Sequence, residues 1–133
     1  MTTAPVQTSE QTQEAAGAAG RYVELRIGQN WVAVCELADL TPGRGVAALL
    51  PDGHQVAVFL DRDGRSYAVG NRDPFSGAYV LSRGLLGSAA GRPFVASPLL
   101  KQRFDLATGG CLDDETASVP AYVTRRSGES AAG

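Results

Sequence analysis

The sequence predicts an all-β protein, an antiparallel β-sandwich or barrel. Short runs in which apolar and polar residues alternate recur from Tyr22 onwards, turn sequences separate them at regular intervals, and no segment carries a long helical period. Together these three observations favour many short strands over helices. The chain has 133 residues, of which 44% are hydrophobic and 20% charged, the size and composition of one folded domain.

The first two strands are predicted at residues 23–27 (VELRI) and 31–35 (WVAVC). In the first run Val23 and Leu25 point to the face opposite Glu24, because successive side chains of a strand alternate. The ELADL stretch that follows has the length of one helical turn, and TPGRG then breaks it.

Two hairpins are predicted next. The runs at 46–50 (VAALL) and 56–60 (VAVFL) are joined by the turn sequence PDGHQ. The second run then turns through DRDG into 65–70 (RSYAVG), where Gly64 accepts a positive φ. The segment therefore predicts three antiparallel strands in succession.

The remaining strands are predicted at residues 92–96 (RPFVA), 102–106 (QRFDL) and 119–125 (VPAYVTR), with ATGG as a turn. Between Asn71 and Gly91 lies a Gly- and Ser-rich stretch that is too long for a simple hairpin turn. We expect it to be a loop, and loops of that length in a compact domain usually carry function or an interface.

Composition divides the chain into three parts. Residues 1–20 are rich in Ala, Gly, Thr, Gln and Glu without apolar periodicity, which predicts a disordered N-terminal tail. Residues 21–126 form the predicted β domain, and residues 127–133 are expected to be a flexible C-terminal tail.

Charge and hydropathy limit the partners. Lys and Arg number 12 and Asp and Glu 14, a net charge of −2, so the chain has no basic footprint for nucleic acid or an anionic membrane. No apolar run approaches the ~18 residues of a membrane span, and the N-terminus has no signal-peptide pattern. We expect a cytoplasmic protein whose partners are neither nucleic acid nor membrane, and whose two cysteines are free thiols.

Two long motifs bring a family resemblance. The stretches YAVGNRDPFSGAYVLSRGLLG and FVASPLLKQRFDLATGGCL, followed by VPAYVTR, resemble a Rieske-type domain over roughly residues 30–126. In that family two loops carry C-x-H and C-x-x-H, and an F-D-L-x-T-G-x-C-L strand and turn follows the second. The resemblance implies an antiparallel β-sandwich or barrel with a smaller loop subdomain.

The four cluster-ligand positions of the family can be located in this sequence by aligning the F-D-L-x-T-G-x-C-L motif at Phe104. The first loop's cysteine and histidine correspond to Asp73 and Phe75, and the second loop's to Ser97 and Leu100. A Rieske [2Fe–2S] centre needs two thiolates on one iron and two imidazoles on the other. The resemblance therefore implies a loop subdomain without the cluster and no metal or cofactor on this chain. We expect Phe75 and Leu100 to fill by apolar packing the space that a cluster would take.

A cluster-free chain with NRDPFSGA, LSRGLLG and SPLLKQRFDLATGGCLDD in this order is similar to the small subunits of NAD(P)H-dependent assimilatory nitrite reductases. That resemblance implies an accessory subunit, inactive alone, that docks on a large subunit carrying FAD, an iron–sulfur cluster and siroheme. The complex reduces nitrite to ammonium with six electrons. The alternative is a cluster-free Rieske-like binding or regulatory module of another oxidoreductase. An electron-carrying Rieske ferredoxin is disfavoured by the missing ligands.

The residues around the two loops have the composition of a protein-binding surface, because aromatic, aliphatic and arginine side chains are mixed there. The candidate partner interface consists of Arg72, Asp73, Pro74, Phe75, Leu99, Lys101 and Arg103. Packing of the loop leucines into the core is the alternative.

No residue pattern predicts catalysis on this chain. Ser97 has no G-x-S-x-G surroundings, and the only histidine, His54, lies in a turn sequence that projects it into solvent. The acidic run at 113–115 fits a solvated turn better than a cation site. GLLGSAAG lacks the Lys-Ser/Thr of a phosphate loop.

Overall fold

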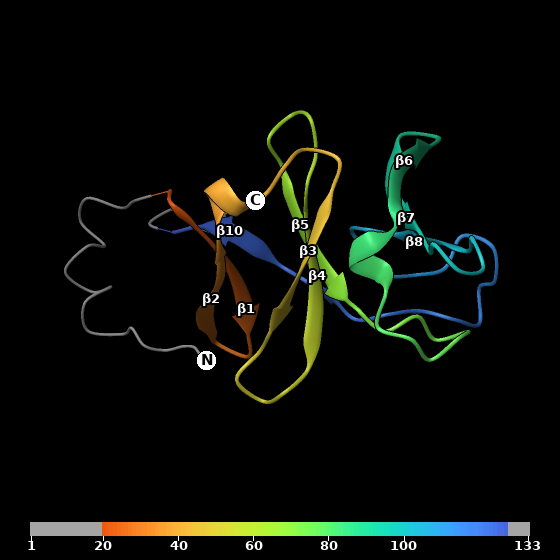
Figure 1. Ribbon diagram of the computed structural model, residues 1–133, viewed down its shortest axis with the longest axis horizontal. Coiled ribbons are helices and arrows are strands. Elements are labelled where there is room, and N and C mark those ends of the chain that lie inside the picture. The colour runs from red at the N-terminus through yellow and green to blue at the C-terminus, as the bar shows by residue number, and fades with distance from the viewer. Residues whose placement is uncertain (1–19, 128–133) are drawn as a thin grey trace.

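The computed structural model describes residues 20–127, which form three antiparallel β-sheets (Figure 1). Apart from Gly20 and Ser127, the tails predicted at 1–20 and 127–133 lie outside the described residues. The strands are β1 (Tyr22–Ile27), β2 (Asn30–Glu36), β3 (Gly45–Leu49), β4 (Gln55–Leu60), β5 (Ser66–Gly70), β6 (Leu85–Ala89), β7 (Arg92–Ala96), β8 (Arg103–Asp105), β9 (Ala121–Tyr122) and β10 (Thr124–Arg126). The all-β prediction is confirmed.

The first sheet has the order β10-β1-β2. In β1, Val23 and Leu25 are fully buried while Glu24 is only partly buried, which is the alternation that the sequence predicted. The ELADL stretch forms the single 3-10 turn η1 (Leu37–Asp39), as expected from its length. This sheet stands at the left of Figure 1.

The second sheet, in the order β3-β4-β5-β9, lies between the other two (Figure 1). Its central strand β4 is buried on both faces. Val56 and Val58 belong to the core shared with the first sheet, whereas Ala57 and Phe59 belong to the core shared with the third. Because alternate residues of a strand face opposite sides, one strand of six residues divides the interior into two apolar clusters.

The third sheet, in the order β6-β7-β8, contains a strand that the sequence did not predict. Within the stretch expected to be a loop, residues 81–83 form a second 3-10 turn, η2, and residues 85–89 form β6. The glycine content that argued for a loop has a packing reason. A Cβ on Gly87 would come within 2.6 Å of the Phe94 ring, so only glycine lets β6 lie so close to β7.

The closing segment VPAYVTR divides between two sheets. Its residues 121–122 pair with β5 as β9, and residues 124–126 pair with β1 as β10. One short segment thus joins the first and second sheets. The helical elements among residues 20–127 are single 3-10 turns, and none has the length or apolar content of a membrane-spanning helix.

Candidate functional site

Two loops leave the second and third sheets and meet. The first loop, residues 71–79, follows β5, and the second loop, residues 97–102, follows β7. The Ser97 hydroxyl Oγ donates a hydrogen bond of 2.6 Å to Oδ2 of the Asp73 carboxylate. Both side chains are buried, so a polar contact shielded from water ties one loop to the other.

Asp73 also organises its own loop. Its Oδ1 accepts the backbone N–H of Phe75 at 2.8 Å, and its backbone carbonyl accepts the N–H of Gly77 at 2.7 Å. In the second loop, Ser97 Oγ accepts the N–H of Leu99 at 3.3 Å. Each carboxylate oxygen of Asp73 therefore has a donor, which a buried charged group requires.

The contact between Asp73 and Ser97 has a simple relation to Rieske geometry. The two cysteines of a Rieske centre bind the same iron, so their side chains converge on one point. Asp73 and Ser97, the residues that the resemblance sets at those two positions, converge in the same way. Here a direct hydrogen bond joins them where an iron would stand between two sulfurs.

The two apolar residues at the imidazole positions behave differently. Phe75 is half-buried and packs against the core, with its ring centroid 6.2 Å from that of Phe104. Leu100 is 51% exposed, so the expectation that it fills the space of a cluster is wrong. The second loop is a tight turn closed by the N–H of Lys101 donating to the Ser97 carbonyl, with Lys101 at φ 70°. Such a turn carries its central residues outwards, away from the core.

Two members of the predicted interface are engaged within the chain. Asp73 is fully buried and cannot meet a partner, because it serves as the acceptor between the loops. Arg103 forms a bidentate pair with Asp113, at 3.2 and 2.8 Å, and its guanidinium lies 5.5 Å from the centroid of the Phe94 ring. The hydrogen bonds from Arg103 hold the pKa of Asp113 below its usual value.

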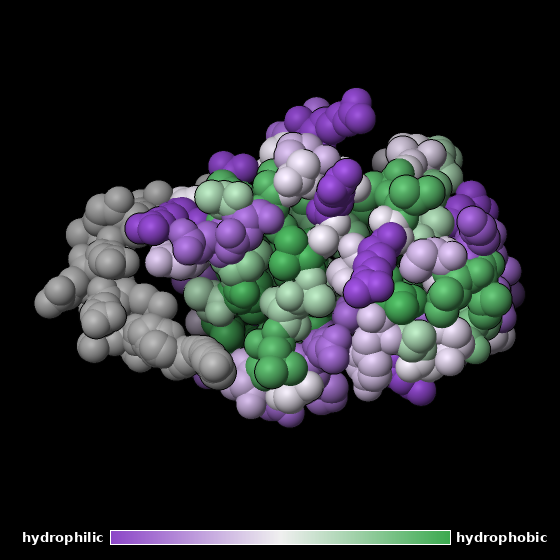
Figure 2. All heavy atoms as spheres, in the orientation of Figure 1, coloured by the Kyte–Doolittle hydropathy of each residue, from purple (hydrophilic) through white to green (hydrophobic). Residues whose placement is uncertain are grey.

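The exposed side chains of the two loops are mainly apolar. Leu99 is 51% exposed, Lys101 in the same loop is exposed, and so are Arg72 and Pro74 in the first loop. Leu85, 73% exposed, is the first residue of β6 and pairs with Ala96 directly before the second loop, so the surface reaches the start of β6. Figure 2 shows green side chains gathered at this end of the molecule, the right in the view, mixed with purple ones. We call the exposed side chains of Leu85, Leu99, Leu100 and Lys101 the loop surface.

The donor atoms of the chain do not fit a [2Fe–2S] cluster. The whole sequence holds one histidine and two cysteines, and the described residues contain no group of three or more potential metal ligands. Cys35 lies in β2 and packs against the apolar cluster between the first and second sheets, whereas Cys111 belongs to the cluster between the second and third sheets. His54 is exposed in the β3–β4 turn, with its Nδ1 2.9 Å from Asp52. Burial, with Asp39 and Glu36 nearby, raises the pKa of the Cys35 thiol to about 11, so it stays protonated at neutral pH.

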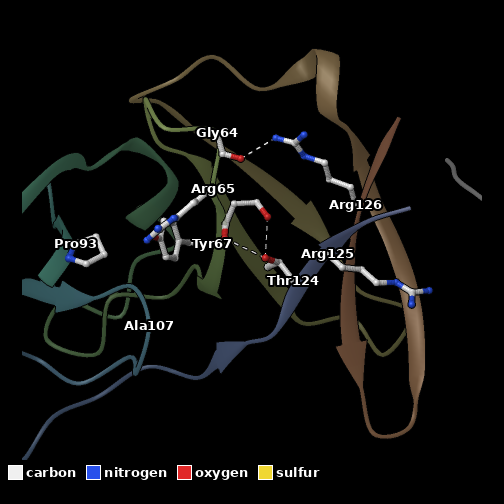
Figure 3. Close-up of a pocket in the computed structure, with 9 residues that line it drawn as sticks. Gly64, Arg65, Tyr67, Pro93, Ala107, Thr124, Arg125 and Arg126 are labelled. Atoms are coloured by element: carbon white, nitrogen blue, oxygen red, sulfur yellow. Dashed lines mark hydrogen bonds between the residues drawn. The ribbon is translucent and has the colours of Figure 1, made fainter. Parts of the chain in front are cut away.

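A shallow groove of about 610 Å³ lies at the far ends of β5 and β7 from the loops (Figure 3). Arg65 and Tyr67 extend towards Pro93 across it, while Arg125 points away to its partner Glu24. β5 runs from this groove to the first loop, and β7 runs from Pro93 to the second. With ~3.3 Å per residue, four residues of strand separate the groove from the loops by roughly 13 Å.

A smaller hollow of about 270 Å³ adjoins the first loop. Sequence patterns gave no sign of it, because its walls come from segments distant in the chain. They are the β3–β4 turn, the end of β5, the first loop and residues 118–122. Tyr79, 54% exposed, stands in this wall and was missing from the predicted interface.

The fold and its paired loops without ligands define a Rieske-like domain. In agreement, residues 30–131 match the family of Rieske-like [2Fe-2S] domains. The chain is 47% identical over 96 residues to the nitrite reductase (NADH) small subunit of Salmonella typhimurium, covering 71% of this chain and 88% of the relative. It belongs to the family of nitrite reductase small subunits.

Two further comparisons extend this finding. The solution structure of the E. coli protein NirD superimposes with a TM-score of 0.63 at 41% identity, covering 75% of this chain and 98% of that one. The nitrite reductase [NAD(P)H] large subunit of Klebsiella oxytoca is 44% identical over 95 residues, which are 71% of this chain but 10% of the relative. In Klebsiella a Rieske-like segment of this kind is thus part of the large subunit's own chain.

Proposed function

We propose that this chain is the accessory small subunit of a cytoplasmic NAD(P)H-dependent nitrite reductase, docked on the large subunit through its ligand-free loops. The complex reduces nitrite to ammonium. The observation that carries the proposal is the pair of loops held together by Asp73 and Ser97, with half-exposed leucines at the tip of the second loop. The loops keep a defined shape without a cluster, as a docking surface needs.

The Klebsiella relative supports a large subunit as the partner. When two interacting domains are linked in one chain, the contact between them becomes intramolecular. The effective concentration of one domain at the other then rises to about the millimolar range. A segment 44% identical to this chain occurs inside a large subunit. A separate small subunit must reach the same contact by affinity alone, and this favours an exposed apolar surface.

The chemistry of the chain supports an accessory role. Neither the loops nor the rest of residues 20–127 bring together three or more side chains that could hold a metal ion. In the proposed complex the electrons from NAD(P)H pass through the large subunit, for which the family resemblance implies FAD, an iron–sulfur cluster and siroheme. The small subunit contributes contacts rather than electron transfer.

Co-expression with the large subunit tests the proposal. A tagged chain is expected to retain the large subunit on an affinity column, and nitrite-dependent NAD(P)H oxidation is expected from the complex and not from the isolated chain. Leu99→Ser should weaken the association, because it makes an apolar contact polar. Val123→Ser, at the junction of β9 and β10, is a control of matched exposure, 54% against 51%.

Retention of a different oxidoreductase in place of the nitrite reductase large subunit would instead support a regulatory module of another system. If Leu99→Ser and Val123→Ser weakened the association with the large subunit equally, the docking surface would not be located at the loops.

A further inference from the structure

The 270 Å³ hollow beside the first loop is built to receive an apolar side chain. Its walls carry the rings of Tyr79 and Tyr122 together with Pro74 and Pro120. Its volume lies at the lower edge of the ~300–1,000 Å³ typical of pockets for drug-sized ligands, and this size suits an inserted side chain of a partner protein better than a nucleotide or flavin.

Two polar side chains in the wall, Asn71 and His54, are already engaged within the chain. The side-chain amide of Asn71 donates to Gln55 Oε1 at 3.0 Å, and its oxygen accepts the N–H of Ser82 at 2.8 Å. His54 is held by Asp52 at 2.9 Å. The tyrosine and proline rings that line the hollow favour an apolar occupant.

Arg72 supplies the charge at this site. It is exposed and lines the hollow, and none of the ion pairs among residues 20–127 involves it. Its backbone pairs with that of Tyr79 across the first loop. Arginine and tyrosine are enriched where binding energy concentrates in interfaces, and a guanidinium binds a carboxylate bidentately.

The hollow is continuous with the loop that the proposed function assigns to docking, because Arg72 and Pro74 belong to both. We propose that the large subunit inserts an apolar side chain, with a carboxylate next to it, into the hollow between Tyr79 and Pro120. This inference rests on the proposed function and names a second anchor beside the loop surface. The acidic group pairs with Arg72, and the apolar group fills the volume.

Two substitutions test the anchor from different sides. Arg72→Glu reverses the charge at the rim, and Ser118→Trp occupies the hollow from its own exposed wall residue. Each is expected to weaken binding to the cofactor-loaded large subunit by about tenfold or more, measured as Kd by titration of the purified partners.

Matched controls exist on the same chain. Arg65→Glu makes the same charge reversal in the groove at the opposite ends of β5 and β7, and Ser88→Trp makes the same enlargement on exposed β6. Both controls should bind within about twofold of the wild type, because exposed positions outside an interface are nearly neutral. Melting temperatures of the isolated variants show that each is folded.

The outcomes separate this inference from the proposed function. If the wild-type chain does not bind the large subunit, the proposed function fails. If the wild type binds and Leu99→Ser weakens it while Arg72→Glu and Ser118→Trp leave Kd unchanged, docking stands and the anchor is refuted. Equal losses in Arg72→Glu and Arg65→Glu also refute it, because general electrostatic attraction then explains the effect.

Discussion

Ser97 Oγ and Asp73 Oδ2 lie 2.6 Å apart and are buried, and this contact connects two loops through residues that are 24 positions apart in the chain. In a Rieske centre the corresponding side chains would be joined through iron. Here the protein itself supplies the cross-link between the two loops. We therefore expect this hydrogen-bonded pair to contribute to the stability of the two loops.

Removing the hydroxyl of this pair should destabilise the fold. Ser97→Ala leaves Asp73 Oδ2 buried without its donor, and we expect a loss of about 1–3 kcal/mol in the free energy of unfolding. Urea unfolding measures it. Ser88→Ala, an exposed serine on β6, should change it by less than about 0.5 kcal/mol. A similar small change in Ser97→Ala would mean that the pair does not support the loops.

Phe75 and Leu100 should respond in opposite ways to truncation. Phe75→Ala removes a ring packed on Phe104, and we expect a cost of about 2–3 kcal/mol, below that of a fully buried phenylalanine. Leu100→Ala truncates a side chain that is half exposed and should cost less than about 0.5 kcal/mol. Its effect is expected on binding to the large subunit. Thermal unfolding and binding of each variant distinguish the two, and a large stability loss in Leu100→Ala would contradict the exposed position.

Asp105 should make stability depend on pH. Burial by itself would raise the pKa of Asp105, but hydrogen bonds from the N–H groups of Thr108 and Ala107 and from Arg92 outweigh it and hold the pKa below the ordinary value of 3.8. A carboxyl with a lowered folded-state pKa stabilises the fold fully above its unfolded pKa, and this stability is lost as pH falls through the folded pKa.

We therefore expect Asp105→Asn to be less stable than the wild type at pH 7, by on the order of 1–2 kcal/mol. The difference should shrink below about pH 4, where the carboxyl of the unfolded wild-type chain begins to protonate while that of the folded chain stays ionised to lower pH. Urea unfolding from pH 7 to pH 2.5 measures it. Glu115→Gln changes an exposed carboxylate and serves as control. A difference that stays constant with pH would show that the effect is not electrostatic.

The purified chain should contain no stoichiometric iron and show no visible absorbance. Two imidazoles are needed for a Rieske centre, and the sequence has one histidine. Metal analysis after anaerobic purification tests this. About two irons per chain would require ligands other than those of the Rieske family.

Much of the fold was predictable from local pattern. Alternation in VELRI depends only on neighbouring residues, and this run became β1 with Val23 and Leu25 buried as expected. The apolar run VAVFL also became a strand, β4, which is buried on both faces. The strand β6 was missed because glycine at position 87 is unfavourable in an isolated strand, and its reason for being there is the Phe94 ring of a strand further along.

The candidate site, too, was predictable from the sequence only in part. The sequence by itself determined which chemistry is absent, because residue types alone show that the thiolate and imidazole sets are missing. Only the tertiary structure decided that Asp73 lies inside, that Leu100 lies outside, and that Arg72 and Tyr79 border a hollow with residues 118–122. Burial and hydrogen bonding at these positions arise from segments that meet only after folding, so no local pattern carries them.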